Sequence, residues 1–357
     1  MILSTTFNKP FNRPNNKMQK HSIKIDKPFE FEAGGFLDSL DIVYHTSPRE
    51  YTPGEKVIWV CHALTGNSDP EEWWPVMVGK GKLFDPDKFY IVCVNILCSP
   101  YGTTCPASIN PRTGKPFFFD FPKTTVRDLV RANILVRQHL GIEKIDLMIG
   151  PSLGGFQTLE WVIMEPDVVK NAIFLATATR AMPYLVAFNE SQRMALEADP
   201  TFREAKSLKG GAAGLSCARS IALISYRNYD CYNIRQQETD EDVLFANRAC
   251  TYQQHQGYKL VNRFDAYCYW YLTYCFDSQN IGRGRGGVAN ALKRIKADCM
   301  VISIDSDTLF PPKQALQTAR LLSHASYNEL TSIYGHDGFL IEGEQLTAIL
   351  SHKINAL

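Results

Sequence analysis

Three residues that lie far apart in the chain could together carry out acyl transfer. Ser152 is the centre of a G-x-S-x-G motif, GPSLG, which is typical of a sharp turn from a strand into a helix that leaves the serine hydroxyl exposed. Asp307 follows a late apolar run, and His336 follows a glycine in the segment SIYGHDGFL. A serine nucleophile, a histidine base and a carboxylate that orients the histidine form a catalytic triad, here in the chain order Ser, Asp, His.

Two other residues compete for places in this triad. Asp305 lies at the end of the same apolar run as Asp307 and is the less favoured partner of the histidine. His62 follows an early strand, and its position upstream of the serine favours a structural histidine over the catalytic base. Four histidines in polar or terminal settings are expected at the surface: His21, His139, His324 and His352.

The elements on either side of Ser152 must hold its hydroxyl in place. The segment KIDLMIG before it is an apolar run of strand length, and GGFQTLEW after it has the apolar spacing of a buried helix. A side chain at Gly150 or Gly154 would collide with the neighbouring strand or helix, so glycine is expected at both positions. The start of the helix directs backbone N–H groups toward the place where an oxyanion would form.

A second turn is predicted at the end of an earlier strand. The apolar run 57–61 leads into the segment HALTG, and ligands of α/β sheets bind at the carboxyl ends of central strands. The backbone N–H groups of Leu64 in this turn and of Leu153 after the serine are therefore predicted to form an oxyanion hole. The alternative is a turn with only a structural role.

The order of elements predicts the fold class. Further apolar runs of strand length lie at 89–96, 171–178 and 300–304, and a helix is predicted at 124–140. Strands that alternate with helices in this way form a mostly parallel sheet covered on both faces. From Phe29 onward the sequence alternates as antiparallel strands do, and the long loop 99–122 is predicted to wrap over the active face.

The chain divides into three parts by this pattern. Residues 1–25 are expected to form a disordered arm. The α/β core is assigned to residues 26–182 and 289–357. Residues 183–288 between them show helical stretches and no strong strand, which predicts a helical lid inserted into the core.

Polar side chains within the apolar helices of this lid are either substrate contacts or exposed and salt-bridged groups. The four candidates are Arg193, Arg219, Tyr226 and Tyr269. The segment GRGRGGV at 282–288 follows no strand and lacks the Lys-Ser/Thr ending, so a phosphate-binding loop is not expected there.

Composition limits the class of partner. The chain has 357 residues, 45% of them hydrophobic, and a net charge of +1, so no global field favours nucleic acid or an acidic membrane, and small molecules are the expected partners. The apolar stretches are too short to span a bilayer and residues 1–20 contain no signal-peptide core, which predicts a cytosolic protein. The ten cysteines form no C-x-x-C pair, so reduced, mostly buried thiols and no metal site are expected.

From about Phe29 to Leu340 the chain resembles the homoserine O-acetyltransferase family of the α/β-hydrolase superfamily. The matching segments are CHALTG, EEWWPVMVGKGKLFDPDKFYIVCVN, INPRTGKP, FPKTTVRDLV, GGFQTLEW, SQRMALEADP, GLSCARSIALISYR, QGYKLVNRFDAY, GRGRGGVANALKRIKA, SDTLFPP and YGHDGFL. The resemblance implies an α/β-hydrolase fold with a helical lid, and transfer of an acetyl group from acetyl-CoA to the side-chain hydroxyl of L-homoserine, a step of methionine biosynthesis.

The same resemblance implies roles for individual residues. Ser152 would be the nucleophile, with Asp307 and His336 as its partners. Arg219 and Asp337 would contact the amino-acid substrate, and Tyr226 is the additional lid residue expected near it. The resemblance also implies a cytoplasmic homodimer with no bound cofactor, in which acetyl-CoA is a co-substrate.

Two departures from the family pattern leave alternatives open. Gly-Pro-Ser-Leu-Gly-Gly replaces the usual Gly-Gly-Ser-Met-Gly-Gly, so Pro151 stiffens the turn, and Tyr267-Cys268 replaces an Asn-Ser pair, where a bulkier aromatic side chain could reshape the substrate pocket. The alternatives are a serine or homoserine O-succinyltransferase, an esterase that uses water as the acceptor, and a non-catalytic binding protein of the same fold.

Overall fold

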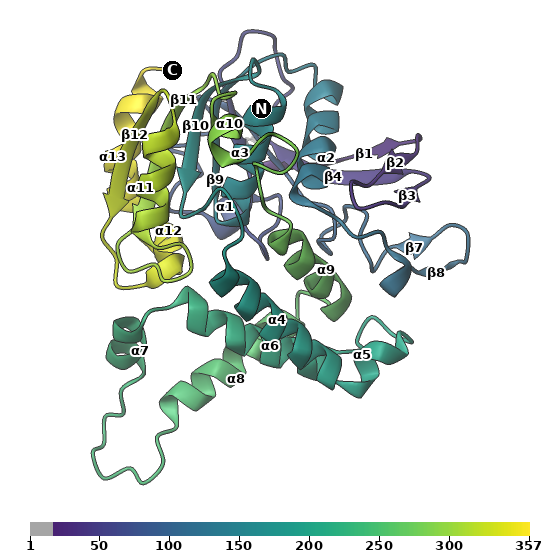
Figure 1. Cartoon of the computed structure of the whole chain (residues 1–357), viewed down its shortest axis with the longest axis vertical. Coiled ribbons are helices and arrows are strands. Elements are labelled where there is room, and N and C mark those ends of the chain that lie inside the picture. Colours follow the sequence, from purple (N-terminus) through teal and green to yellow (C-terminus); the bar gives the residue numbers. More distant parts are fainter. Residues whose placement is uncertain (1–16) are drawn as a thin grey trace, which may run out of the picture.

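An eight-stranded sheet forms the centre of the computed structural model, which describes residues 17–357 (Figure 1). The strands in spatial order are β1 (Gln19–Ile25), β4 (Leu40–Thr46), β6 (Tyr90–Val94), β5 (Val57–Val60), β9 (Ile145–Pro151), β10 (Val169–Leu175), β11 (Asp298–Ile304) and β12 (Ala325–Leu330). Strands β1 and β4 run antiparallel to their neighbours, and the six from β6 to β12 are parallel. The predicted mostly parallel sheet is therefore confirmed.

The central strands are continuous apolar runs because both faces of the sheet are covered. In β9, Met148 points into one buried core, and its neighbours Leu147 and Ile149 point into the core on the opposite face. The helices α2 (Val126–His139), α3 (Leu153–Met164) and α11 (Pro312–Leu321) contribute to the first core. Helix α13 (Gly343–Asn355) and the segment after the short helix α1 (Pro70–Trp73) cover the second.

Helix α2 shows how local sequence sets an element's ends. The hydroxyl of Thr125 accepts a hydrogen bond from the backbone N–H of Asp128, and the Asp128 carboxylate accepts one from the N–H of Thr125. This reciprocal capping box starts the helix, and Gly141, at φ +66°, follows its end. The predicted helix at 124–140 is observed at 126–139.

The lid is made of helices only. They are α4 (Pro183–Ala198), α5 (Pro200–Glu204), α6 (Ala212–Tyr226), α7 (Tyr229–Gln236), α8 (Arg248–Val261) and α9 (Ala266–Asp277), and the short α10 (Val288–Leu292) follows. Helix α4 packs against α6 and α9, and α6 packs against α8. In Figure 1 helices α4 to α8 form a layer below the sheet, with α9 between this layer and the core.

The expectation of a disordered arm over residues 1–25 is wrong for its last part. Residues 1–16 lie outside the described residues, but Gln19–Ile25 forms edge strand β1, paired antiparallel with β4 from Gln19 opposite Thr46 to Ile25 opposite Leu40. Most side chains of β1 are exposed and only Ile23 is buried, so the strand lacks the apolar pattern by which the others were identified.

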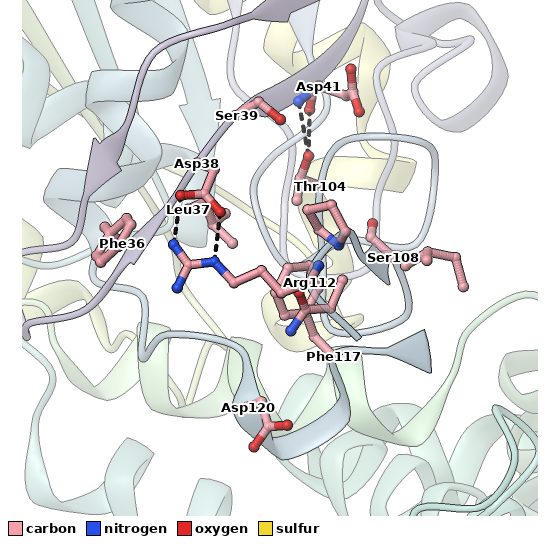
Figure 2. Close-up of a pocket in the computed structure, with 13 residues that line it drawn as sticks. Phe36, Leu37, Asp38, Ser39, Asp41, Thr104, Ser108, Arg112, Phe117 and Asp120 are labelled. Atoms are coloured by element: carbon pink, nitrogen blue, oxygen red, sulfur yellow. Dashed lines mark hydrogen bonds and ion pairs between the residues drawn. The ribbon is translucent and has the colours of Figure 1, made fainter. Parts of the chain in front are cut away.

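The loop 99–122 does not cover the cavity that holds Ser152. It contains β7 (Ile109–Asn110), β8 (Lys115–Pro116) and the 3₁₀ turn η1 (Phe118–Asp120), and it packs against lid helix α9. Residues 104–120 of this loop and the hairpin of β2 (Phe29–Glu30) and β3 (Phe36–Leu37) form a separate surface pocket. Figure 2 shows the guanidinium of Arg112 reaching the Asp38 carboxylate there, with contacts of 2.7 and 2.8 Å.

The segment GRGRGGV has a structural role. The Arg285 guanidinium donates to Oε2 of buried Glu160 in α3 at 2.8 Å, and the Arg127 side chain of α2 reaches Oε1 of the same carboxylate at 2.9 Å. Arg283 pairs with Glu32 at 2.8 Å. These ion pairs fasten the chain to the core helices where it returns from the lid.

All ten cysteines are free thiols, eight of them buried, and Cys217 and Cys250 are exposed on the lid. Within residues 17–357, no helix combines the length and the hydropathy needed to cross a membrane.

Candidate active site

Ser152 sits in a strained turn between β9 and α3. Its backbone has φ +57° and ψ −122°, a conformation that residues with a side chain rarely adopt. A Cβ added at Gly150 would lie 2.2 Å from the carbonyl oxygen of Gly154, and one added at Gly154 would lie 2.0 Å from the carbonyl oxygen of Cys61. Only glycine fits at either position, because backbone atoms that cannot move away occupy the space.

His336 and Asp307 meet at the carboxyl ends of β11 and β12. Nδ1 of His336 lies 2.7 Å from Oδ2 of Asp307, and both side chains are buried. The other carboxylate oxygen of Asp307 accepts hydrogen bonds from the N–H groups of Leu309 at 2.8 Å and Phe310 at 2.9 Å. The carboxylate is thus fixed in position and places the imidazole proton on Nδ1.

The second imidazole nitrogen is left as a proton acceptor. Nε2 of His336 is buried and has no hydrogen-bond partner within residues 17–357, and the Ser152 and His336 side chains line the same cavity. Asp305 is exposed, and its carboxylate accepts from the N–H of Ser332 at 3.0 Å. The strand β12 before His336 ends at Leu330, and the 3₁₀ turn η2 (Gly335–Asp337) carries the histidine.

The two backbone groups predicted for the oxyanion hole lie beside the serine. Leu153 is the first residue of α3, where an N–H group has no acceptor within the helix and the helix dipole favours negative charge. Leu64 belongs to the loop after β5 and lines the cavity together with Ser152. Their role as oxyanion donors stays a prediction.

His62 holds this loop in shape. It is fully buried, its Nδ1 donates to the carbonyl of Ala63 at 2.8 Å, and its Nε2 accepts from the N–H of Ile96 at 3.1 Å. Burial lowers the pKa of His62 to about 4, so the ring is neutral at pH 7. His62 therefore has the contacts of a structural histidine.

The cavity above Ser152, of about 170 Å³, has walls from both the core and the lid. The loop after β5, Trp73 and the segment around His336 form the core side, and Arg219, Tyr226 and Arg263 form the lid side. Of the four polar lid residues singled out from the sequence, Arg219 and Tyr226 line this cavity.

Arg219 brings a positive charge to the cavity. Its guanidinium lies 5.5 Å from the ring centroid of Tyr226 and makes no ion pair with any carboxylate of residues 17–357. The Tyr226 ring lies 5.9 Å from the imidazole of His336, and burial raises the pKa of Tyr226, which keeps its hydroxyl protonated. A carboxylate entering the cavity would meet Arg219 close to the catalytic histidine.

Asp337 supplies the opposite charge. Its carboxylate lines the same cavity and lies 2.9 Å from Nε of Arg227, the residue that ends α6. Sequence reasoning did not identify Arg227 as its partner. This ion pair joins the lid directly to the residue that follows the catalytic histidine.

The other two polar lid residues singled out from the sequence do not line the cavity. Arg193 is buried between Glu190 at 2.7 Å and Asp277 at 2.8 Å. The hydroxyl of Tyr269 donates to Gln192 at 2.5 Å. These two side chains hold lid helices together.

The unusual Tyr267-Cys268 pair, which could have reshaped the substrate pocket, packs inside the lid. Tyr267 stacks on Phe202 at 5.1 Å and donates to its carbonyl oxygen at 3.0 Å, and Cys268 is fully buried in α9. Neither lines the cavity around Ser152. Pro151 is the last residue of β9, at a strand end where a proline is tolerated.

Arg263 was missed by sequence reasoning. Its guanidinium donates to the carbonyl oxygen of Thr65 and to the hydroxyl of Tyr101, both at 2.6 Å, so it ties the lid to the loop that carries Leu64. The contact joins residues 198 positions apart, and no local pattern marks it. Among the residues that the structure describes, no group of three His, Cys, Asp or Glu side chains could hold a metal ion.

The fold and the serine, histidine and aspartate arrangement define an α/β-hydrolase, and the family described as alpha/beta hydrolase fold matches residues 56–342. A homoserine O-acetyltransferase of Cyclobacterium marinum is 41% identical over 94% of this chain and 95% of its own length. The chain belongs to the homoserine O-acetyltransferase family of enzymes, which confirms the resemblance seen in the sequence.

Two solved structures show how widely this fold is used. A homoserine O-acetyltransferase from Bacillus anthracis has a TM-score of 0.88 at 22% identity, over 95% of this chain and 98% of that one. An acetylester hydrolase from Corynebacterium glutamicum has a TM-score of 0.82 at 22% identity, over 95% and 96%. Both support the fold alone, and the fold does not distinguish a transferase from a hydrolase.

Proposed function

We propose that the protein transfers an acetyl group from acetyl-CoA to the side-chain hydroxyl of L-homoserine through an acetyl-Ser152 intermediate. The main observation behind the proposal is that a positive and a negative side chain line the same small cavity. Arg219 and Asp337 line the cavity that holds Ser152 and His336, so it offers a cation and an anion to an amino acid beside a nucleophile and its base. The names of the curated relatives point to the same reaction.

The first half-reaction acylates the serine. Nε2 of His336 takes the proton of the Ser152 hydroxyl as its oxygen attacks the thioester carbonyl. The N–H groups of Leu64 and Leu153 stabilise the oxyanion, each contributing on the order of 3 kcal/mol to the transition state. His336 then gives the proton to the departing thiolate, CoA leaves, and Asp307 balances the imidazolium charge throughout.

The second half-reaction transfers the acetyl group. The homoserine carboxylate binds Arg219, its ammonium group binds Asp337, and its hydroxyl points to the acyl carbon. His336 takes the hydroxyl proton as the oxygen attacks the ester, and Ser152 recovers its proton when O-acetylhomoserine leaves. Because each half-reaction releases a product before the next substrate reacts, the kinetics are ping-pong.

We place this reaction in methionine biosynthesis in the cytoplasm, with a homodimer as the working unit. Support for the dimer comes from the lid, where large apolar side chains are exposed on three helices: Ile224 at 56%, Ile234 at 61% and Tyr258 at 64%. Exposed apolar groups on neighbouring helices are typical of an interface. Mass measurement in solution tests this, and a monomer at micromolar concentration contradicts it.

The direct test is a thiol-release assay with acetyl-CoA and succinyl-CoA against homoserine, serine and no acceptor. We expect CoA release from acetyl-CoA that depends on homoserine and is lost in Ser152→Ala. Equal release without any acceptor identifies an esterase, because a transferase must keep water from the acyl-enzyme. Preference for succinyl-CoA or for serine identifies the corresponding related transferase, and no reaction of Ser152 with any activated ester identifies a binding protein.

A further inference from the structure

A second cavity, of about 400 Å³, lies behind the ion pair of Arg227 and Asp337. Its walls come from α7, α8 and the C-cap of α6 in the lid and from the core segment between β12 and α13. Two arginines, Arg227 and Arg235, and three tyrosines line it, together with two glutamines. No Asp or Glu is among the described residues that line this cavity.

The two arginines carry more positive charge than their surroundings neutralise. Their guanidinium groups lie 5.6 Å (Arg227) and 5.4 Å (Arg235) from the ring centroid of the same Tyr334. Arg227 is paired with Asp337, whereas Arg235 donates a hydrogen bond to the Tyr334 hydroxyl and contacts no carboxylate of the described chain. Two neighbouring guanidinium groups, of which only Arg227 has a carboxylate partner among the described residues, leave a site that favours an anion.

The tyrosines add a neutral, aromatic surface. Tyr232 and Tyr252 lie edge to face, with ring centroids 6.1 Å apart. Burial raises the pKa of Tyr232 to about 12, so its phenol carries no negative charge that would repel an anion. Such rings can stack on a planar base.

The second cavity is next to the catalytic one. In helix α12 (Gly338–Ile341), Phe339 and Leu340 line the cavity of Ser152, and Ile341 lines the second cavity. Tyr334 is two residues from His336, so their Cα atoms are at most about 7.6 Å apart. The second cavity therefore lies within reach of a flexible arm that extends to the catalytic histidine.

We propose that the second cavity binds the phosphate-bearing nucleotide end of the acyl donor. This inference rests on the proposed function, in which the acyl group arrives as a thioester of CoA. Guanidinium groups bind phosphate oxygens in a bidentate manner, and the tyrosines contact the adenine ring. The pantetheine arm then passes the Arg227–Asp337 pair and delivers the thioester to Ser152.

The test compares a full donor with one that lacks the nucleotide. Acetyl-CoA carries the phosphates, and S-acetyl-N-acetylcysteamine carries the same thioester without them. We expect Arg235→Ala to raise the KM for acetyl-CoA by about tenfold, the loss of one charge-assisted contact. The same variant should leave kcat/KM for the short thioester and the KM for homoserine unchanged. Arg235→Lys should recover part of the loss.

Controls separate this inference from the function on which it rests. Arg320→Ala, an exposed arginine on α11, should leave both donors unaffected. Adenosine 3′,5′-bisphosphate should compete with acetyl-CoA in the wild type and at least tenfold less well in Arg235→Ala. An equal loss with both thioesters, or unchanged kinetics with both, overturns the second cavity as the nucleotide site. If neither thioester acetylates homoserine in the wild type, the proposed function itself fails.

Discussion

The imidazole of His336 and the carboxylate of Asp307 form a buried hydrogen bond of 2.7 Å that joins the loops after β11 and β12. Asp307 cannot rotate away, because two backbone N–H groups hold its other oxygen. The imidazole therefore presents a fixed Nε2, which has no hydrogen-bond partner among residues 17–357, to the cavity of Ser152. The geometry makes the orientation of the base depend on the charge of Asp307.

Replacing Asp307 by asparagine should lower kcat by about 10⁴-fold, because an amide favours the wrong imidazole tautomer and cannot balance the imidazolium charge. Steady-state CoA release with homoserine as acceptor measures the effect. Asp305→Asn is the matched control, since this exposed carboxylate accepts a hydrogen bond from the backbone of Ser332 and does not pair with His336, and it should keep most of the activity. Comparable losses in both variants would contradict the assignment of Asp307.

Replacing Arg219 by alanine should raise the KM for homoserine between about 10-fold and 100-fold, because a charge-assisted contact to the carboxylate is lost. The pre-steady-state burst of CoA from acetyl-CoA should be unaffected, because serine acylation does not involve this contact. The acceptor 3-aminopropan-1-ol, which lacks the carboxylate, provides the control. The wild type should prefer homoserine strongly, and Arg219→Ala should lose most of that preference; an unchanged preference would exclude the contact.

Glu160→Ala should destabilise the protein by about 3–5 kcal/mol, because it leaves the largely buried Arg285 guanidinium without its carboxylate, whereas Arg127 keeps its pair with Glu32. Glu160 is 2% exposed and pairs with Arg127 and Arg285. Urea unfolding measures the change. Glu204→Ala, which removes an exposed pair with Lys206, should cost no more than about 1 kcal/mol. Equal effects would mean that the buried network contributes little.

The free energy of unfolding should fall on acidification, because His62 takes up a proton when the chain unfolds. The pKa of His62 is about 4 in the folded protein and 6.5 in the unfolded chain, so between these values the unfolded state binds more protons. The contribution is fully present above pH 6.5 and decreases by on the order of 3 kcal/mol by pH 4. Unfolding free energies from pH 7 to pH 4 should fall more steeply in the wild type than in His62→Asn. Parallel curves would contradict a neutral, buried His62.

The sheet and the turn around Ser152 could be predicted because their causes are local. Continuous apolar runs mark strands covered on both faces, and Gly150 is required by a contact with Gly154 within the same turn. Gly154 belongs to the same motif, but the backbone that a side chain there would strike, at Cys61, is distant in the chain. The capping residues of α2 likewise lie within four positions of each other. Strand β1 escaped prediction because an exposed edge strand with one buried side chain has no such local signature.

The walls of the site depend on contacts that the sequence does not mark. Arg263, between α8 and α9, contacts Thr65 of the core, and Arg227 pairs with Asp337 across the boundary between lid and core. Loop 99–122 looked long enough to cover the serine, but its aromatic residues pack under α9, where Phe118 and Tyr267 meet at 4.7 Å. Which face such a segment covers is decided by packing partners distant in the chain.

The insertion of the lid between β10 and β11 also has a consequence for synthesis of the polypeptide. The ribosome synthesises Ser152 first, then the lid helices, and only afterwards β11 and β12, the strands that position Asp307 and His336. Since domains form from the N-terminal side during translation, a nascent chain carries an ordinary, unactivated hydroxyl. It stays inert toward cellular thioesters until the last strand joins the edge of the sheet.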